Sequence, residues 1–292
     1  MATTRVRLDL AYDGTAFSGW ARQNGLRTVQ GELESRLAEL FRSTGAAPTV
    51  TVAGRTDVGV HATGQVAHVD LGDAELAVLD RVRGNAITKG AASLARRLTG
   101  IGGPVSDLVV ARSAVAPDGF DARFAALWRR YEYRIADGRA PHDPRRRDHT
   151  LWHPTELDDA AMESAAASLL GLHDFAAFCR PREGATTIRM LQEFSWGRDD
   201  DGVLVARVRA DAFCHSMVRA LVGASIAAGE RRLAAGGVAA LRDAGVRTSA
   251  FKVVPARGLT LVEVGYPPDD ELAARVERTR ARREVADLEP ID

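Results

Sequence analysis

A glycine-rich loop with a single carboxylate is the sequence feature that most limits which folds this chain can adopt. The segment AGRTDVGVHATGQVAHVD spans residues 53–70, and Asp57 is the only acid within its loop. Residues 49–53 before the loop and residues 65–71 after it alternate apolar and polar side chains, which predicts two strands. Three glycines spaced five residues apart suit a loop that takes positive φ or lets another backbone approach closely. We therefore expect a loop, held at both ends, that presents Asp57 at the edge of a sheet.

Polar side chains crowd this loop more densely than a turn requires. An aspartate in a loop most often caps a turn by accepting hydrogen bonds from nearby backbone amides. Here Arg55 and Thr56 precede Asp57, and His61 and Thr63 follow it. This crowding favours a functional site over a cap. An ion pair between Arg55 and Asp57 at rest would favour the ionised carboxylate.

The order of the predicted elements indicates an α+β fold with two similar domains, each an antiparallel sheet backed by helices. Besides the two strands around the loop, the patterns predict strand 5–12, helix 29–41, a helical region 76–98, strand 108–115, strand 129–135, helix 157–170, strand 203–210, helix 215–228 and strand 259–264. We expect residues 1–111 to form the N-terminal domain with the aspartate loop, residues 112–268 the C-terminal domain, and residues 269–292 a charged tail.

Six blocks of the sequence resemble the TruA family of tRNA pseudouridine synthases, whose nucleophilic aspartate lies in an A-G-R-T-D-x-G-V-H motif. Beyond the Asp57 loop, the matching blocks are YDGTAFSGWARQ from Tyr12, FDARFAALWRRYEYRI from Phe120, GLHDFAAF from Gly171, FCHSMVRALVG from Phe213 and ARGLTLVEVGYP from Ala256. The resemblance implies the pseudouridine synthase fold, with the active-site cleft between the two domains. It also implies isomerisation of uridines 38, 39 and 40 in the anticodon stem-loop of tRNA, by a homodimer that grips one tRNA across both subunits.

The resemblance also assigns roles to three residues of this chain. Asp57 is the nucleophile, Arg55 helps to displace or hold the target base, and Tyr131 packs on the uracil. A base inside a stem is out of reach, so the enzyme has to extrude it and replace the lost stacking with its own contacts. Without the resemblance, Tyr131 would equally suit an ordinary core aromatic, since it shares a strand face with Tyr133 and Ile135.

Converting uridine to pseudouridine needs no external donor or energy source, so we expect no cofactor and no metal. A free aspartate side chain is ionised at neutral pH and can act without an activating histidine. The carboxylate can attack the base at C6, attack the ribose at C1′, or remove the 2′ proton to give a glycal, and the residues favour none of these routes. Neither His61 nor His68 has another histidine at the i, i+4 spacing of a helical metal pair, so both are expected to make structural contacts.

The charge of the chain is compatible with RNA binding although it sums to zero. The sequence has 39 basic and 39 acidic residues, and nearly all of the basic ones are arginine, which can fork onto phosphate and stack on bases. The candidate RNA-binding residues are Arg22, Arg123, Arg129, Arg130, Arg207, Arg209 and Arg219. The basic stretch Arg145 to Arg147 suits a loop facing RNA and a solvated connector equally well. For Trp20 we favour a buried anchor over stacking on RNA.

The remaining sequence features indicate where in the cell the protein is expected and which alternative functions are open. The first residues hold no apolar core of a signal peptide, and no stretch of about eighteen apolar residues occurs, so we expect a cytoplasmic protein without a membrane span. Cys179 and Cys214 are too few for a disulfide framework and are expected to be reduced. The rivals are a non-catalytic tRNA-binding or RNA-folding module of the same fold and a glycoside hydrolase, which would need a second carboxylate that the motif lacks.

Overall fold

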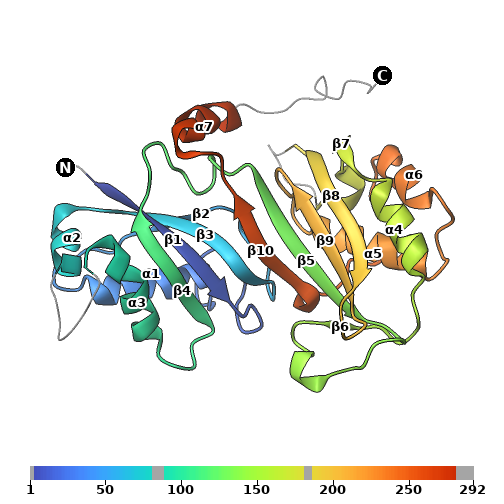
Figure 1. Cartoon of the computed structure of the whole chain (residues 1–292), viewed down its shortest axis with the longest axis horizontal. Coiled ribbons are helices and arrows are strands. Elements are labelled where there is room, and N and C mark those ends of the chain that lie inside the picture. Colours follow the sequence, from blue (N-terminus) through green and yellow to red (C-terminus); the bar gives the residue numbers. More distant parts are fainter. Residues whose placement is uncertain (1–2, 81–88, 181–185, 281–292) are drawn as a thin grey trace. The chain divides into compact units, whose positions relative to one another are not determined.

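The computed structural model describes residues 3–80, 89–180 and 186–280, which form two compact units (Figure 1). The first unit runs from the N-terminus to Leu127 and takes in Leu261–Arg280, and the second contains Trp128–Thr260. Each unit is a mostly antiparallel sheet with helices, so the predicted α+β class is confirmed. Within the described residues, no helix has the length and apolar character that a membrane span requires.

The first unit is built on three neighbouring strands with β10 following them in the sheet order. Its elements are β1 (Thr4–Tyr12), α1 (Val29–Leu40), β2 (Val50–Val52), β3 (His61–Leu71), α2 (Asp73–Asp80), α3 (Ala91–Gly102), β4 (Leu108–Val115), the part of β10 (Leu259–Gly265) from Leu261 on, and α7 (Leu272–Arg280). The order is β4, β1, β3, β10, and β2 pairs with β3. Strand β1 is antiparallel to both β3 and β4.

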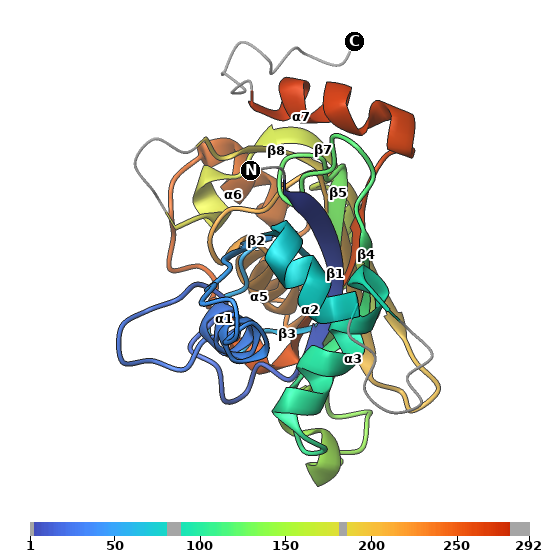
Figure 2. The ribbon, with the colours of Figure 1, turned by 90° about the vertical axis from the view of Figure 1, so that its left-hand side faces the viewer.

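Apolar residues at helical and strand spacing make the core of this unit. Leu8 of β1, Leu33 and Leu37 of α1, and Leu94 and Leu98 of α3 are all completely buried. Each such side chain stabilises the fold by roughly 1.5 to 3 kcal/mol through its removal from water. Helix α3 contacts β4, α1 and α2, and Figure 2 shows these three helices close together.

The first unit extends beyond the boundary expected near residue 112. Position 112 lies inside β4, and the chain after β4 continues to bond to this unit. The amide of Ala116 donates to the carbonyl of Arg5 at 2.8 Å, and the amide of Ala122 donates to Nδ1 of His68 at 3.0 Å. Composition gives no sign of these long-range bonds. Part of the expected charged tail forms helix α7, in which Leu272 and Val276 are buried.

The second unit has a four-strand order with one short extra strand. Its elements are β5 (Trp128–Ala136), β6 (Leu151–Trp152), α4 (Asp159–Ala167), β7 (Gly171–Asp174), β8 (Ile188–Arg198), β9 (Leu204–Ala210), α5 (Met217–Gly229) and α6 (Gly237–Ala244). The order is β5, β9, β8, β7, all antiparallel, and β6 runs parallel to β5. Helix α4 contacts both α5 and β8.

Most predicted elements are present, and the differences have local causes. Strand β3 starts at His61 rather than at Gln65, because the pairing with β1 continues past a register shift to Ala62, which stands opposite Tyr12. Strand β8 was not predicted, since its sequence IRMLQEFSWGR alternates poorly, and the short β7, β6 and α6 were also missed. A tight turn joins β8 to β9, with the Gly202 amide donating to the Asp199 carbonyl at 2.9 Å. Part of the predicted helical region 76–98 lies outside the described residues.

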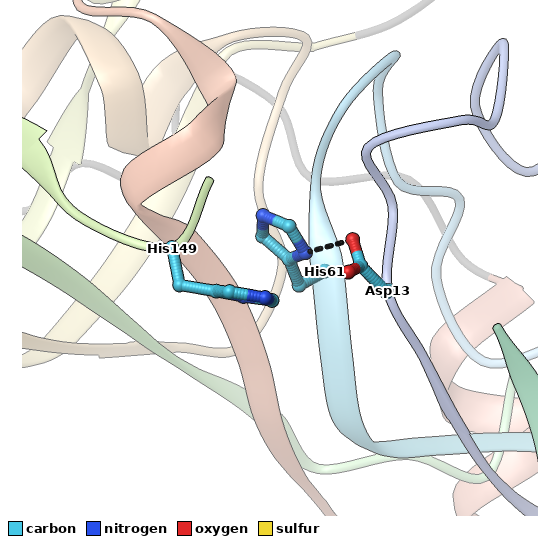
Figure 3. Close-up of side chains that lie close together, drawn as sticks. All are labelled: Asp13, His61 and His149. Atoms are coloured by element: carbon cyan, nitrogen blue, oxygen red, sulfur yellow. Dashed lines mark ion pairs between the residues drawn. The ribbon is translucent and has the colours of Figure 1, made fainter. Parts of the chain in front are cut away.

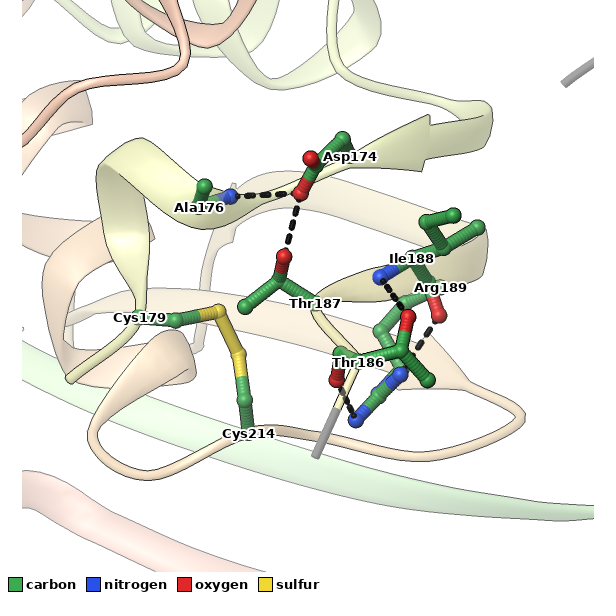
Figure 4. Close-up of a disulfide and its surroundings, with 8 residues drawn as sticks. All are labelled: Asp174, Ala176, Cys179, Thr186, Thr187, Ile188, Arg189 and Cys214. Carbon is green, nitrogen blue, oxygen red and sulfur yellow. Dashed lines mark hydrogen bonds between the residues drawn. A yellow bond between two sulfur atoms is a disulfide. The ribbon is translucent and has the colours of Figure 1, made fainter. Parts of the chain in front are cut away.

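The expectation that both cysteines are reduced is wrong, because Cys179 and Cys214 form a disulfide (Figure 4). Their Cα atoms are 5.7 Å apart, although 35 positions separate them in the sequence. Two loops bring them together, one just after a short 3-10 turn and the other between β9 and α5. Beside the bond, the Arg180 amide donates to the His215 carbonyl at 3.1 Å. The pairing depends on how these loops pack, which spacing alone does not reveal.

Candidate functional site

The loop between β2 and β3 presents Asp57 and is tied to the sheet at its base. The amide of Ala53 donates to the carbonyl of Val66 at 2.8 Å, which closes the loop onto β3. At the tip, the amide of Val60 donates to the carbonyl of Asp57 at 3.2 Å. The turn needs positive φ at Gly59, which has a φ of 76°, a conformation that costs glycine little. The expected presentation of Asp57 between two strands is therefore observed in the first unit.

The segment between β1 and α1 contacts the same loop. The Trp20 amide donates to the Thr56 carbonyl at 3.0 Å, and the Gly59 amide donates to the Phe17 carbonyl at 3.4 Å. Trp20 is 1% exposed, so the preferred interpretation as a buried anchor is confirmed. The blocks around Tyr12 and Asp57, far apart in the sequence, thus form one structure.

Asp57 and Arg55 differ in exposure. The side chain of Asp57 is half-buried, while Arg55 is exposed and has no hydrogen bond or ion pair among the described residues. The resting ion pair between Arg55 and Asp57 that the sequence suggested does not form. An exposed guanidinium two residues from a half-buried carboxylate can contact a base or a phosphate without first breaking an internal pair.

His61 and His68 make the structural contacts expected of them. Nδ1 of His61 lies 3.0 Å from the Gly14 amide and 3.1 Å from Oδ1 of Asp13. Figure 3 shows the contact between His61 and Asp13. The His68 ring accepts from the Ala122 amide, as described above. Burial lowers the pKa of His68, which keeps the ring neutral and able to accept that bond.

Tyr131 lies on β5 of the second unit, on the buried face of the strand. It is 7% exposed, stands opposite Val208 of β9 and meets Phe213 edge-on with ring centroids 5.1 Å apart. Tyr133 shares this face, and its hydroxyl donates to the carbonyl of Pro255 at 2.8 Å. Tyr131 is therefore a buried ring in apolar surroundings that include another aromatic side chain.

Two of the candidate arginines lie on the same side of the sheet as Tyr131. Arg129 precedes it by two residues on β5 and donates to the Asp211 carbonyl at 2.8 Å. Arg219 lies on α5 and donates through Nε to the Val254 carbonyl at 2.7 Å. Both guanidiniums are therefore partly engaged by backbone oxygens, which fixes their orientation.

Three other candidates lie on the opposite face of the same sheet. Arg130 stands opposite Arg209 in the β5 and β9 register, and both guanidiniums lie over the ring of Trp128, at 5.2 and 5.5 Å from its centroid. Arg207 is on the same face, with Nε 3.8 Å from Glu132. Alternation along a strand puts these side chains on the face away from Tyr131. Trp128 was not singled out from the sequence, because its role depends on the pairing of two strands.

The remaining arginine candidates are exposed residues of the first unit. Arg22 is 72% exposed with its guanidinium 3.6 Å from Glu34, and Arg123 lies over the ring of Phe124 at 5.1 Å. In the connector after β5, Arg145 pairs with Asp143 at 2.7 Å and Arg146 pairs with Asp201 at 2.6 Å.

Comparison with known proteins identifies the family. A family model described as tRNA pseudouridine synthase matches residues 165–267. The chain is 61% identical to tRNA pseudouridine synthase A of Leifsonia xyli, over 96% of this chain and 98% of the relative. It is 56% identical to the protein of the same name from Frankia casuarinae (96% and 95% covered) and 51% identical to that from Streptomyces avermitilis (96% and 94% covered). The chain therefore belongs to the tRNA pseudouridine synthase A family, a family of isomerases.

Proposed function

We propose that this protein converts uridine to pseudouridine at positions 38, 39 and 40 of the tRNA anticodon stem-loop, with Asp57 as the nucleophile. The observation that carries the proposal is the alignment of 96% of the chain, at 61% identity, with a relative named tRNA pseudouridine synthase A. The anchored loop adds support, because it holds a half-buried carboxylate beside an exposed guanidinium. The positions in tRNA follow from the resemblance of the sequence motifs.

The reaction is an isomerisation, so its atoms balance without a second substrate. The bond between C1′ and uracil N1 breaks, a bond between C1′ and C5 forms, N1 gains a proton and C5 loses one. In each of the three routes to this outcome, by attack at C6, by attack at C1′ or through a glycal, an ionised carboxylate is the reacting group. We assign that role to Asp57.

Base extrusion requires contacts that replace stacking and pairing within the stem. We assign these contacts to Arg55, whose guanidinium displaces or holds the base, and to Tyr131, which packs on the uracil. The exposure of Arg55 and the apolar surroundings of Tyr131 suit these roles. Arg55→Ala is expected to slow turnover more than it weakens tRNA binding.

Affinity for the RNA backbone comes, in this proposal, from arginines that neutralise phosphates. The residues assigned to these contacts are Arg22, Arg123, Arg129, Arg130, Arg207, Arg209 and Arg219. The protein acts without a cofactor, in the cytoplasm, as a homodimer that binds one tRNA across both subunits. Light scattering of the purified protein tests the dimer, since a monomer has a mass of 31.3 kDa.

Tritium release from tRNA labelled at uracil C5 tests the reaction, because C5 loses its hydrogen only when the new carbon bond forms there. Wild type is compared with Asp57→Ala and with Asp118→Ala, an exposed acid in another loop of the first unit. Release by wild type and Asp118→Ala, with none from Asp57→Ala and with tRNA affinity unchanged, supports the proposal. Substrates with cytidine at position 38, 39 or 40 test each position in turn.

Two results would contradict parts of this proposal. Full turnover by Asp57→Ala would remove the nucleophile assignment and leave the family activity to another residue. Binding of tRNA by wild type, without tritium release from any anticodon-stem substrate, would favour the rival function of a non-catalytic tRNA-binding module.

A further inference from the structure

Three buried polar side chains link the Asp57 loop to strands β1 and β3. The hydroxyl of Tyr12 lies 2.8 Å from the hydroxyl of Thr56, and Nε2 of Gln65 donates to that tyrosine oxygen at 3.1 Å. Gln65 also donates to the carbonyl of Gly54 at 2.9 Å. Exposure is 5% for Tyr12, 6% for Thr56 and 0% for Gln65. Since none of the three reaches solvent, a direct role in contacting RNA does not explain them.

The amide of Gln65 makes three hydrogen bonds, two through its nitrogen and one through its oxygen. Its two N–H groups have acceptors in Tyr12 and Gly54, and its oxygen accepts from the Val66 amide at 3.2 Å. Glutamate at this position would lose both donors, and methionine would lose every bond while keeping similar volume. Burial raises the pKa of Tyr12 to about 12, so its hydroxyl remains protonated and available at neutral pH.

The cluster of Tyr12, Thr56 and Gln65 restrains Thr56, the residue that precedes Asp57. The side chain of Thr56 is held by Tyr12, and its carbonyl accepts from the Trp20 amide at 3.0 Å. The next carbonyl, that of Asp57, accepts from Val60. With Thr56 restrained from both sides, the backbone at Asp57 has little freedom to rotate. A displacement of about 1 Å at a reacting group can cost on the order of 100-fold in rate.

We propose that Tyr12 and Gln65 are positioning residues for the reaction, which orient the Asp57 carboxylate by fixing the peptide at Thr56. This inference rests on the proposed role of Asp57 as the nucleophile. Neither side chain touches the substrate, so their loss lowers kcat rather than tRNA affinity. A merely structural role predicts lost thermal stability with unchanged kcat at temperatures where the protein is folded.

Tyr12→Phe and Gln65→Met test the inference, with Ser113→Ala as the matched control. Ser113 is another buried hydroxyl of the first unit, 5% exposed, which accepts from the Ala95 amide at 2.8 Å and donates to the Ala91 carbonyl at 2.6 Å. We expect Tyr12→Phe and Gln65→Met to lower kcat by about 10-fold to 100-fold, with the Kd for tRNA changed less than about threefold. Ser113→Ala should lower Tm comparably and leave kcat unchanged. Equal kcat in all three variants would overturn the inference.

A second pair of variants covers the case in which Tyr12→Phe or Gln65→Met fails to fold. Thr56→Ser keeps the hydroxyl and should retain the kcat of wild type, while Thr56→Val keeps the shape without the hydroxyl and should lose kcat as the first two variants do. Equal kcat for both Thr56 variants would contradict the inference.

Asp57→Ala in the same assay distinguishes failure of the nucleophile assignment from failure of the positioning role of Tyr12 and Gln65. Turnover by Asp57→Ala would overturn the nucleophile assignment and the inference with it. An inactive Asp57→Ala beside fully active Tyr12 and Gln65 variants would overturn the inference alone.

Discussion

The guanidinium of Arg198 donates two hydrogen bonds of 2.9 Å to the carboxylate of Asp137, which has no exposed surface. The same carboxylate accepts from the Leu157 amide at 2.9 Å and from the Arg139 amide at 3.2 Å. Arg198 is also paired with Asp159, again at 2.9 Å. Four donors thus surround Asp137, and they tie the start of the connector after β5 to the end of β8.

Asp137→Ala should lower the free energy of unfolding by about 1 to 3 kcal/mol, because it leaves the Leu157 and Arg139 amides without their acceptor and Arg198 with Asp159 as its remaining ion-pair partner. Urea denaturation of the purified variant measures the change. The control is Asp201→Ala, which removes an ion pair with Arg146 whose side chains are 53% and 47% exposed. That variant should stay within about 0.5 kcal/mol of wild type. Equal losses in both variants would contradict the argument.

The Asp137 carboxylate should also make the free energy of unfolding depend on pH. Burial opposes ionisation of Asp137, but Arg198 and the two amides outweigh it and lower its pKa to about 2. Since the pKa in the unfolded chain is higher, near the model-peptide value of about 3.9, ionised Asp137 stabilises the fold above pH 4. This contribution, about 2 kcal/mol, is lost as the pH falls from about 4 to about 2. Asp137→Asn should flatten the pH dependence in that window, as measured by urea midpoints at each pH.

Reduction of the disulfide between Cys179 and Cys214 should destabilise the second unit. A cross-link over 35 positions restricts the unfolded chain and is worth about 2 to 4 kcal/mol. Urea denaturation with and without a thiol reductant measures the effect. The double variant Cys179→Ser, Cys214→Ser is the control and should show no response to reductant. An identical response of wild type and the double variant would mean that the bond contributes nothing.

Thr28→Ala should destabilise the protein by about 1 kcal/mol through helix α1. Thr28 is the N-cap of this helix, is 1% exposed, and accepts from the Gly31 amide through its hydroxyl at 3.2 Å. Thr28→Ser preserves the acceptor and should recover most of the loss. Thermal unfolding of the two variants side by side provides the measurement, and a larger loss for serine than for alanine would exclude the cap as the cause.

Arg22→Ala should weaken tRNA binding and reduce the dependence of log Kd on log salt concentration by about one phosphate contact. This expectation follows from the proposed phosphate contacts and from the 72% exposure of Arg22. Arg42→Ala is the matched control, since Arg42 is also exposed and lies beyond the other end of α1. Filter binding over a range of salt concentrations should give the wild-type slope for the control and a shallower one for Arg22→Ala.

Local patterns were enough to place most of the helices and strands. The alternation in residues 108–115 predicted β4 with its observed bounds, and the apolar spacing from Val29 predicted α1. The glycine-rich loop was expected between two strands and is found there. These features depend on neighbours along the chain, whose side chains alternate or repeat with the period of one element. Strand β8 was not predicted, because its polar residues interrupt the alternation of apolar and polar side chains.

Contacts between distant residues decided the rest. The disulfide, the strand face taken by each arginine, and the bonds of Tyr12 and Gln65 to the Asp57 loop all depend on strand register and on the packing of loops. A shift of one residue in register would turn Arg130 to the face that Tyr131 now occupies and Tyr131 to the opposite face. The sequence therefore identified the loop that carries Asp57. The tertiary structure identified the buried side chains that hold the loop in place, because hydrogen bonds between separate elements form only once those elements are packed together.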